Sequence, residues 1–130
     1  MPRIEHVALW VRDLDLVCDF YVRYLGATPG PRYQNPVKDF ISRFLSFADG
    51  ARLELMTSTG RLPPATPPAG QPLGLAHLAI SLGSEAAVDS LTGQLQAGGV
   101  KVLDGPRRTG DGYYESVILD PEGNRIELTI

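Results

Sequence analysis

The sequence predicts an α+β fold of two tandem modules, each with the element order β-α-β-β-β. Two similar strand openings stand in the two halves, at 4–9 (IEHVAL) and 75–80 (LAHLAI). Two similar hairpins close the halves and return through 52–55 (RLEL) and 125–128 (RIEL). A segment with helical periodicity follows each opening. Self-similarity of this kind indicates an internal duplication.

In the first module, 4–11 alternates as a strand, with His6, Ala8 and Trp10 on one face. Asp13 is a predicted N-cap for a helix that runs to Leu25 and stops at Gly26. We expect its buried stripe to be Leu14, Val17, Cys18, Tyr21 and Leu25, with Phe20 at the edge. The proline-rich segment 28–39 is expected to be a loop, and 40–47 a strand. Asp49-Gly50 predicts a tight hairpin turn with φ > 0 at both positions, followed by a return strand at 53–56.

The second module follows a proline-rich segment, 59–74, which is expected to be a stiff, extended linker. We therefore divide the single 1–130 domain into module one (1–58), the linker (59–74) and module two (75–130). The second module is predicted to contain a strand at 75–82, a helix from an N-cap at Ser84 to Ala97 with Val88, Leu91 and Leu95 buried, and a strand at 100–103. A loop at 105–112 and a hairpin of 116–119 with 125–130 complete it.

Composition excludes several function classes. With 43% hydrophobic residues and a net charge of −3, the chain offers no electrostatic reason to bind nucleic acid or an anionic membrane. No apolar run approaches the ~20 residues of a membrane span. The single cysteine, Cys18, forms no intrachain disulfide, is expected to pack in the helix and fits a cytoplasmic location.

The only two histidines, His6 and His77, take equivalent positions in the two halves, and so do Glu54 and Glu127. Imidazole and carboxylate are the ligand types that bind Zn²⁺, Ni²⁺, Co²⁺, Mn²⁺ or Fe²⁺. A histidine in the core or a glutamate on a strand surface is an ordinary structural feature when it stands alone. The pairing of all four across the repeat favours a metal site.

These motifs, together with 120–128 (DPEGNRIEL), resemble the vicinal-oxygen-chelate superfamily, the glyoxalase I and bleomycin-resistance group, over nearly the whole chain. The resemblance implies βαβββ modules with curved mixed sheets around a metal-binding cavity. It places the four metal ligands on His6, Glu54, His77 and Glu127, with one divalent ion per site, and the ligand set looks most like that of glyoxalase I. Ni²⁺ or Zn²⁺ is expected, and Co²⁺, Mn²⁺ or Fe²⁺ stay open.

One departure bears on the substrate. Bacterial glyoxalase I carries an arginine four residues after the first histidine and an asparagine four after the first glutamate, and both hold glutathione. Trp10 and Ser58 stand at these positions here. A different thiol adduct or another small α-oxo or α-hydroxy substrate is therefore a reasonable expectation. Trp10, Ser58, Tyr113 and Tyr114 are candidate substrate-binding residues, and strand alternation predicts that one of the two tyrosines faces the cavity.

The resemblance implies a metal-dependent lyase or isomerase that abstracts a proton, with Glu127 the preferred base and Glu54 its symmetry-related alternative. A non-catalytic protein that sequesters a small ligand remains a rival, as do a dioxygenase and a thiol transferase of the same superfamily. Because a single module leaves a sheet edge open, modules are expected to pair. Glyoxalase I relatives suggest a C₂ homodimer with sites shared between chains.

Overall fold

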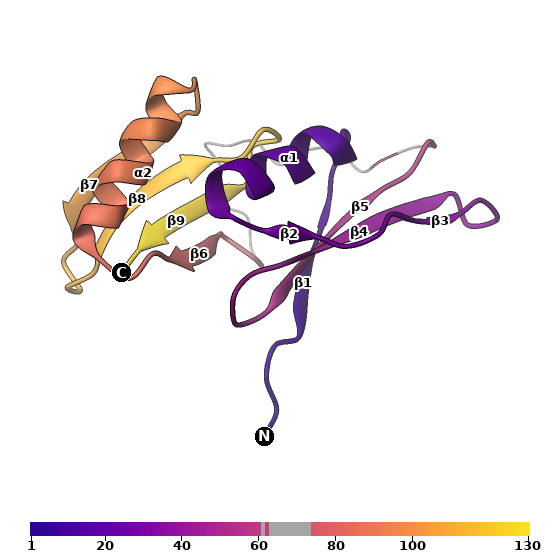
Figure 1. Cartoon of the computed structure of the whole chain (residues 1–130), viewed down its shortest axis with the longest axis horizontal. Helices are drawn as coiled ribbons and strands as arrows, with labels where there is room; N and C mark the ends of the chain where they lie inside the picture. The colour runs from indigo at the N-terminus through magenta and orange to yellow at the C-terminus, as the bar shows by residue number, and fades with distance from the viewer. Residues whose placement is uncertain (61, 63–73) are drawn as a thin grey trace. The chain divides into compact units, whose positions relative to one another are not determined.

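The computed structural model describes residues 1–60, 62 and 74–130. The chain divides into two compact units, Met1–Pro64 and Ala65–Ile130 (Figure 1). Each unit contains one helix and one mixed sheet, which confirms the predicted α+β class. The predicted linker, 59–74, lies mostly outside the described residues.

Unit one contains β1 (His6–Trp10), α1 (Leu14–Leu25), β2 (Thr28–Pro29), β3 (Tyr33–Asn35), β4 (Phe40–Ser46) and β5 (Arg52–Thr57). The order in its sheet is β1-β5-β4-β2, and β3 also pairs with β4. β1 runs parallel to β5, whereas β4 is antiparallel to it. The parallel β1–β5 pair brings the start of the unit beside its end.

Helix α1 begins and ends where the sequence predicts. The Asp13 side chain accepts a hydrogen bond from the Leu16 amide at 2.9 Å, and Gly26 adopts the left-handed conformation with φ 67°. Val17 and Tyr21 are fully buried against β4 and β5, where Leu45 and Leu55 are also fully buried. Phe20, expected at the edge of the stripe, is buried as well, while Leu25 is only half-buried.

Two local predictions in unit one are wrong. The segment 28–39 is not all loop, because it contains β2 and β3, and edge strands tolerate the prolines that suggested a loop. The Asp49-Gly50 turn is longer than a two-residue hairpin, since β4 ends at Ser46 and β5 begins at Arg52. Only Gly50 has a positive φ, 83°, and the Asp49 carboxylate accepts its amide at 2.7 Å.

Unit two contains β6 (Leu78–Ser81), α2 (Glu85–Ala97), β7 (Val102–Arg108), β8 (Tyr114–Leu119) and β9 (Arg125–Thr129), in the sheet order β6-β9-β8-β7. Ser84 caps α2 by accepting the Ala87 amide at 3.1 Å, as predicted. Val88 and Leu95 are fully buried, whereas Leu91 is half-buried. The neighbouring Thr92 is buried too, and its hydroxyl donates to the Val88 carbonyl at 2.6 Å and accepts from Ser116 at 2.7 Å.

The predicted strand at 100–103 continues further than expected, to Arg108, so 105–108 is not loop. β7 is an edge strand whose register shifts twice, and such a strand accommodates Gly105 and Pro106. A side chain at Gly105 would place its Cβ 2.5 Å from the Glu115 carbonyl oxygen, so this close approach requires glycine.

The turn between β8 and β9 depends on Asp120. Its buried carboxylate accepts the Glu122 and Asn124 amides, each at 2.9 Å, and the Asn124 side-chain nitrogen at 2.8 Å. Leaving such buried donors unpaired typically costs about 1–3 kcal/mol. The Asp-Pro-Glu-Gly-Asn motif thus stabilises the turn that precedes β9.

Alternation in the sheets gives each unit two different faces. In β9, Ile126 and Leu128 are fully buried under α2, whereas Glu127 lies on the opposite, helix-free face. In β5, Leu53 and Leu55 are buried on the helix side and Glu54 lies on the helix-free face. Glu54 and Glu127 therefore lie on the side of each sheet that its helix leaves uncovered.

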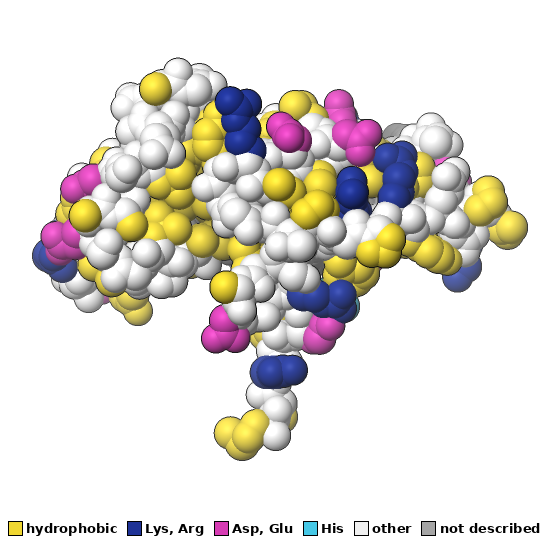
Figure 2. Space-filling view, viewed as in Figure 1, with side chains coloured by type: hydrophobic (Ala, Val, Ile, Leu, Met, Phe, Trp, Pro, Cys, Tyr) yellow, Lys and Arg dark blue, Asp and Glu magenta, His cyan; other side chains and the backbone are white. Residues whose placement is uncertain are grey.

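The surface charge matches the composition. On the face shown in Figure 2, the Lys and Arg side chains of the described residues are interspersed with Asp and Glu side chains. Among these residues no helix is both long and apolar enough to cross a membrane.

Candidate functional site

In unit one, His6 and Glu54 lie together on the helix-free face. His6 opens β1 and pairs with Arg52, while Glu54 pairs with Ala8 on the neighbouring parallel strand. The two side chains are thus diagonal neighbours, and His6 Nε2 lies 3.7 Å from Glu54 Oε1. Ala8, the strand partner of Glu54, has a small side chain.

Unit two repeats this arrangement with His77 and Glu127. His77 precedes β6 by one residue rather than lying within a strand as predicted, and Glu127 pairs with Ala79. His77 Nε2 lies 3.2 Å from Glu127 Oε2. Both histidine side chains are 41% exposed, whereas Glu54 and Glu127 are 14% and 22% exposed. Each unit therefore presents one accessible imidazole nitrogen beside one partly buried carboxylate oxygen.

The chemistry of this donor set fits a borderline divalent cation, which prefers imidazole nitrogen and carboxylate oxygen. Each unit supplies two donors, which is half of a four-coordinate set. Among the described residues there is no group of three or more His, Cys, Asp or Glu side chains arranged to hold a metal ion.

A carboxylate that the sequence reasoning missed lies against His6. Glu5 Oε2 is 2.6 Å from His6 Nδ1, and Glu5 Oε1 accepts hydrogen bonds from Arg52 Nε at 3.0 Å and from Arg52 Nη2. The hydrogen bond with His6 and the bonds from Arg52 lower the pKa of Glu5, so the group is ionised near neutral pH. Glu5 precedes β1, so alternation along the strand does not turn it away from His6.

A second missed carboxylate, Glu115 on β8, lies beside Glu127. Burial raises the pKa of Glu115 above its usual range, and the charge of Glu127 and a hydrogen bond with it raise it further. The equivalent position in unit one is Ser42, because Ser42 pairs with Met56 as Glu115 pairs with Thr129. The sequence signal for this residue was a single carboxyl group, Glu115, in the strand YESVIL. The two halves thus differ in charge around their glutamates.

Aromatic side chains gather near the other end of the helix-free face of unit one. The ring centroids of Trp10 and Phe40 are 6.2 Å apart in an edge-to-face arrangement, and Tyr33 lies 6.2 Å from Phe40. Trp10 is 49% exposed and Tyr33 is 54% exposed. We call these three residues the aromatic cluster. It offers an apolar, polarisable surface where the sequence predicted substrate contacts by Trp10.

Ser58 has a different environment. Its hydroxyl donates to Asp39 at 2.7 Å, and the same carboxylate accepts from the Thr59 hydroxyl at 2.6 Å and from the amides of Thr59 and Gly60 at 3.0 and 2.7 Å. The bonds from Thr59 and Ser58 lower the pKa of Asp39 to about 2. Ser58 therefore holds the end of β5 against the turn before β4, and its hydroxyl proton is already engaged.

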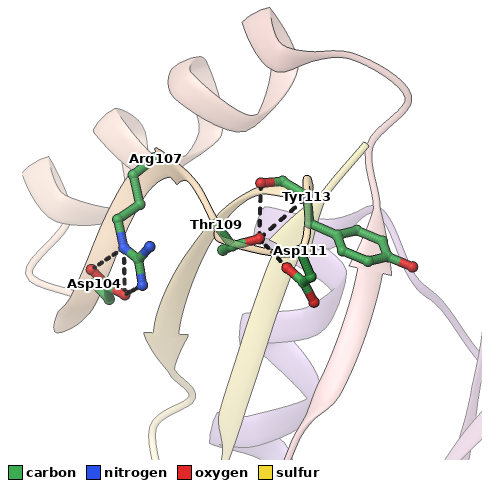
Figure 3. Close-up of polar contacts among 5 residues, drawn as sticks. All are labelled: Asp104, Arg107, Thr109, Asp111 and Tyr113. Atoms are coloured by element: carbon green, nitrogen blue, oxygen red, sulfur yellow. Dashed lines mark hydrogen bonds and ion pairs between the residues drawn. The ribbon is translucent and has the colours of Figure 1, made fainter.

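The two tyrosines have different environments. The Tyr114 hydroxyl donates to Asp89 on α2, so this ring faces the helix. Tyr113, 58% exposed, lies just before β8 in a loop ordered by Thr109, whose hydroxyl contacts Asp111 and accepts the Tyr113 amide at 3.1 Å (Figure 3). Tyr113 is therefore the tyrosine left free of the helix.

The basic side chains near these elements are paired. Arg107 donates to both oxygens of Asp104, at 2.8–3.1 Å, and Arg108 contacts Glu85 (Figure 3 shows the first pair). Arg43 donates to the Gly30 carbonyl at 2.8 Å on the helix side of its sheet. These three guanidinium groups serve the fold of their own unit.

Comparison with known proteins identifies the family of this chain. The family model described as the Glyoxalase/Bleomycin resistance protein/Dioxygenase superfamily matches residues 3–128. The chain belongs to this superfamily. An uncharacterised protein of Pseudomonas aeruginosa is 31% identical over 139 aligned positions, which cover 98% of this chain and 88% of that protein. The superfamily includes glyoxalases, bleomycin-resistance proteins and dioxygenases, so membership establishes the module and not the reaction.

Solved structures of superfamily members have the same fold. A glyoxalase family protein from Enterococcus faecalis is 27% identical, with a TM-score of 0.78 and coverage of 98% of this chain and 96% of that chain. The trypanothione-dependent glyoxalase I of Leishmania major is 23% identical, with a TM-score of 0.79 and coverage of 99% and 86%. Glyoxalase I from Zea mays is 23% identical with a TM-score of 0.78, and the alignment spans 98% of this chain and 44% of the maize chain. The similarity to glyoxalase I at this identity concerns the fold.

Proposed function

We propose that this superfamily member is a divalent-metal-dependent lyase or isomerase of the glyoxalase I type, acting on a small α-oxo or α-hydroxy substrate. One observation carries the proposal. Each unit pairs an exposed imidazole with a partly buried glutamate, with N–O separations of 3.7 and 3.2 Å, on the face that its helix leaves free. A ligand-sequestering protein needs an apolar cavity but has no use for two such matched pairs.

His6, Glu54, His77 and Glu127 would hold the ion, one ion per set of four, with Ni²⁺ or Zn²⁺ preferred. A bound divalent ion would stabilise the negative charge that develops on a substrate oxygen when a proton is removed next to a carbonyl. The chain's own contribution is to bring the two donors of each half within reach of one cation. The sheets provide this because each glutamate lies one position diagonal to its histidine across a parallel strand pair.

Glu127 is the residue to which we assign proton abstraction. Its surroundings differ from those of Glu54, because Glu115 lies beside it and the pKa of Glu115 is raised, whereas Ser42 occupies the matching place in unit one. Neighbouring carboxyl groups resist full ionisation and share protons. The Glu115 carboxyl group, whose pKa is raised, therefore gives Glu127 a neighbouring carboxyl group that Glu54 lacks.

The substrate we favour is a thiol adduct with an apolar or aromatic portion. The aromatic cluster provides a surface for such a portion, and the nearby Ser58 hydroxyl is already engaged by Asp39. The Leishmania major relative is named as trypanothione-dependent, so the thiol partner differs among proteins of this fold. Glutathione itself is less favoured because Trp10 offers no charge to a carboxylate.

The test is a hemithioacetal isomerase assay. We expect protein loaded with Ni²⁺ or Zn²⁺ to isomerise the phenylglyoxal adduct of a thiol faster than the methylglyoxal adduct, because the phenyl ring can pack on the aromatic cluster. Stacked aromatic contacts contribute about 0.5–1.5 kcal/mol beyond burial, which corresponds to a roughly 2- to 12-fold preference in kcat/KM. Trp10→Ala should reduce this preference, with Leu16→Ala as an exposed apolar control. Binding of these adducts without any turnover would favour the sequestering function instead.

We further propose that the site is assembled in a C₂ homodimer, with His6 and Glu54 from one chain and His77 and Glu127 from the other, in the cytoplasm. Each half supplies two donors, so units must pair to complete a set. The alternative is pairing within a single chain. The buried free thiol of Cys18 is compatible with a reducing compartment.

Mixing two inactive variants distinguishes these arrangements. An exchanged heterodimer of His6→Ala and Glu127→Gln chains has one site with both lesions and one intact site. Random 1:1 exchange should then restore roughly a quarter of wild-type activity. Differently tagged chains, followed by native mass spectrometry, show whether exchange has occurred. Complete exchange without recovered activity would assign each site to one chain.

A further inference from the structure

The imidazole of His6 contacts the side chains of Glu5 and Phe44, and Arg52 contacts both of these residues. The Arg52 amide donates to the Glu5 carbonyl at 2.9 Å as part of the pairing of His6 with Arg52, so Glu5 lies at the start of the β1–β5 ladder. Glu5 Oε2 then lies 2.6 Å from His6 Nδ1. The short distance and the ionised acceptor indicate a charge-assisted hydrogen bond.

Arg52 holds this carboxylate in place. Its Nε and Nη2 both donate to Glu5 Oε1, so the guanidinium binds one oxygen and His6 binds the other. The guanidinium also lies over the Phe44 ring, 4.1 Å from the ring centroid. Phe44 in turn meets His6 edge-to-face, with 5.3 Å between ring centroids and an interplanar angle of 82°. The His6 ring is therefore fixed by a closed circuit of contacts through Glu5, Arg52 and Phe44.

The circuit determines which nitrogen of His6 is available. A neutral imidazole has one N–H donor and one lone-pair acceptor, and the partner of one nitrogen decides the tautomer. Because Nδ1 faces a carboxylate, which accepts hydrogen bonds, this arrangement favours a proton on Nδ1. The lone pair then lies on Nε2, the nitrogen 3.7 Å from Glu54 Oε1.

The residue that precedes the histidine differs in the second half. The residue before His77 is Ala76, which has no carboxylate, although Arg125 stands where Arg52 stands in unit one. The duplicated half-sites are therefore chemically unequal. His6 is oriented before any ligand arrives, whereas His77 has no such neighbour on its N-terminal side.

We propose that Glu5, anchored by Arg52, is a positioning residue that sets the Nδ1–H tautomer and the ring orientation of His6, so that unit one presents a preformed ligand to a divalent cation. The proposal that His6 is a preformed ligand for a cation rests on the proposed function. The proposal that Glu5 sets the tautomer of His6 applies to the protein without metal. A histidine ligand oriented by a carboxylate at its other nitrogen typically gains 10- to 100-fold in metal affinity.

The first measurement is the His6 tautomer in metal-free protein, read from long-range ¹H–¹⁵N NMR correlations at a pH well above the ordinary imidazole value of about 6.5. A His77→Gln background leaves His6 as the only histidine. We expect the Nδ1–H form in the parent and a shift toward the Nε2–H form, which free imidazole side chains prefer, in Glu5→Ala. Glu5→Gln keeps an acceptor oxygen and should shift less. Arg52→Ala should give an intermediate shift because the carboxylate loses its anchor.

The second measurement is Ni²⁺ and Zn²⁺ affinity of the full chain with both histidines present, by competition with a chromophoric chelator. Glu5→Ala is expected to weaken binding roughly 10- to 100-fold, and Glu5→Gln less. Glu85→Ala is the matched control, because Glu85 also pairs with an arginine distant in sequence, Arg108, but lies on α2 rather than on the helix-free face of its unit; it should leave the affinity unchanged. Thermal melts of each variant verify that it is folded.

The outcomes separate the two proposals. A parent protein whose His6 is in the Nε2–H form, or whose tautomer does not respond to Glu5→Ala, would overturn the role of Glu5. A tautomer shift with unchanged metal affinity would overturn its role in preparing a ligand. A tautomer shift in a protein that binds neither ion would support the Glu5–His6 coupling and overturn the metal-dependent function.

Discussion

Glu127→Gln is expected to lower turnover by roughly 10²- to 10⁴-fold, the usual range for loss of a general base, while most of the bound metal is retained. The amide oxygen of glutamine can still donate to a cation, but its low basicity prevents it from taking a proton. Metal binding should persist while turnover falls, because His77, whose Nε2 lies 3.2 Å from the Glu127 carboxylate, would still provide a nitrogen ligand. Rate and metal content measured on the same sample separate the two effects.

Two matched variants make this test specific. Glu54→Gln changes the symmetry-related residue, and it should reduce turnover less if Glu127 is the base. Glu85→Gln removes an exposed carboxylate of the same unit and should leave the rate unchanged. Wild-type turnover of Glu127→Gln on a confirmed substrate would remove Glu127 from the role of base. An equal loss in both site variants, accompanied by loss of metal, would show that both residues act only as ligands.

His6→Ala and His77→Ala are each expected to reduce the metal content after dialysis from about one ion per site to below about a tenth, because each would remove one of the four proposed ligands and supply no donor in its place. Both histidine side chains are exposed, so the fold should persist. Elemental analysis after incubation with Ni²⁺ or Zn²⁺ and dialysis measures the loss. If wild-type protein retains neither ion, the metal-dependent function is wrong. Full retention in one variant would exclude that histidine as a ligand.

Several elements were predictable because their signals are local. Asp13 and Ser84 cap the two helices as expected, since a short side-chain acceptor before an amphipathic segment satisfies a free amide whatever the rest of the fold does. The alternation of Ile126, Glu127 and Leu128 correctly assigned their faces, because the strand period is a property of the backbone. The duplication linked the two histidines to the two glutamates before any geometry was available.

Other elements were missed because their signals are not local. The prolines and glycines of 28–39 and 105–108 suggested loops, but these segments are edge strands, where only one side of the strand must supply hydrogen bonds. The two-residue turn expected at Asp49-Gly50 is longer, because the pairing of β4 with β5 decides where each strand ends. Such pairing depends on partners distant in sequence.

The α+β module, its duplication and the four candidate ligands could be predicted from the sequence, because these follow from periodicity and from repetition of residue types. The surroundings of the candidate ligands depend on the tertiary structure. Arg52 holds the Glu5 carboxylate beside His6 because β1 pairs with β5 in one particular register, and Glu115 lies beside Glu127 because of the register of β8 with β9. The contacts of Glu5 with Arg52 and of Glu115 with Glu127 join different strands, at separations that the order of residues along the chain does not encode. The two half-sites are therefore equivalent in ligand type and unequal in their electrostatic surroundings.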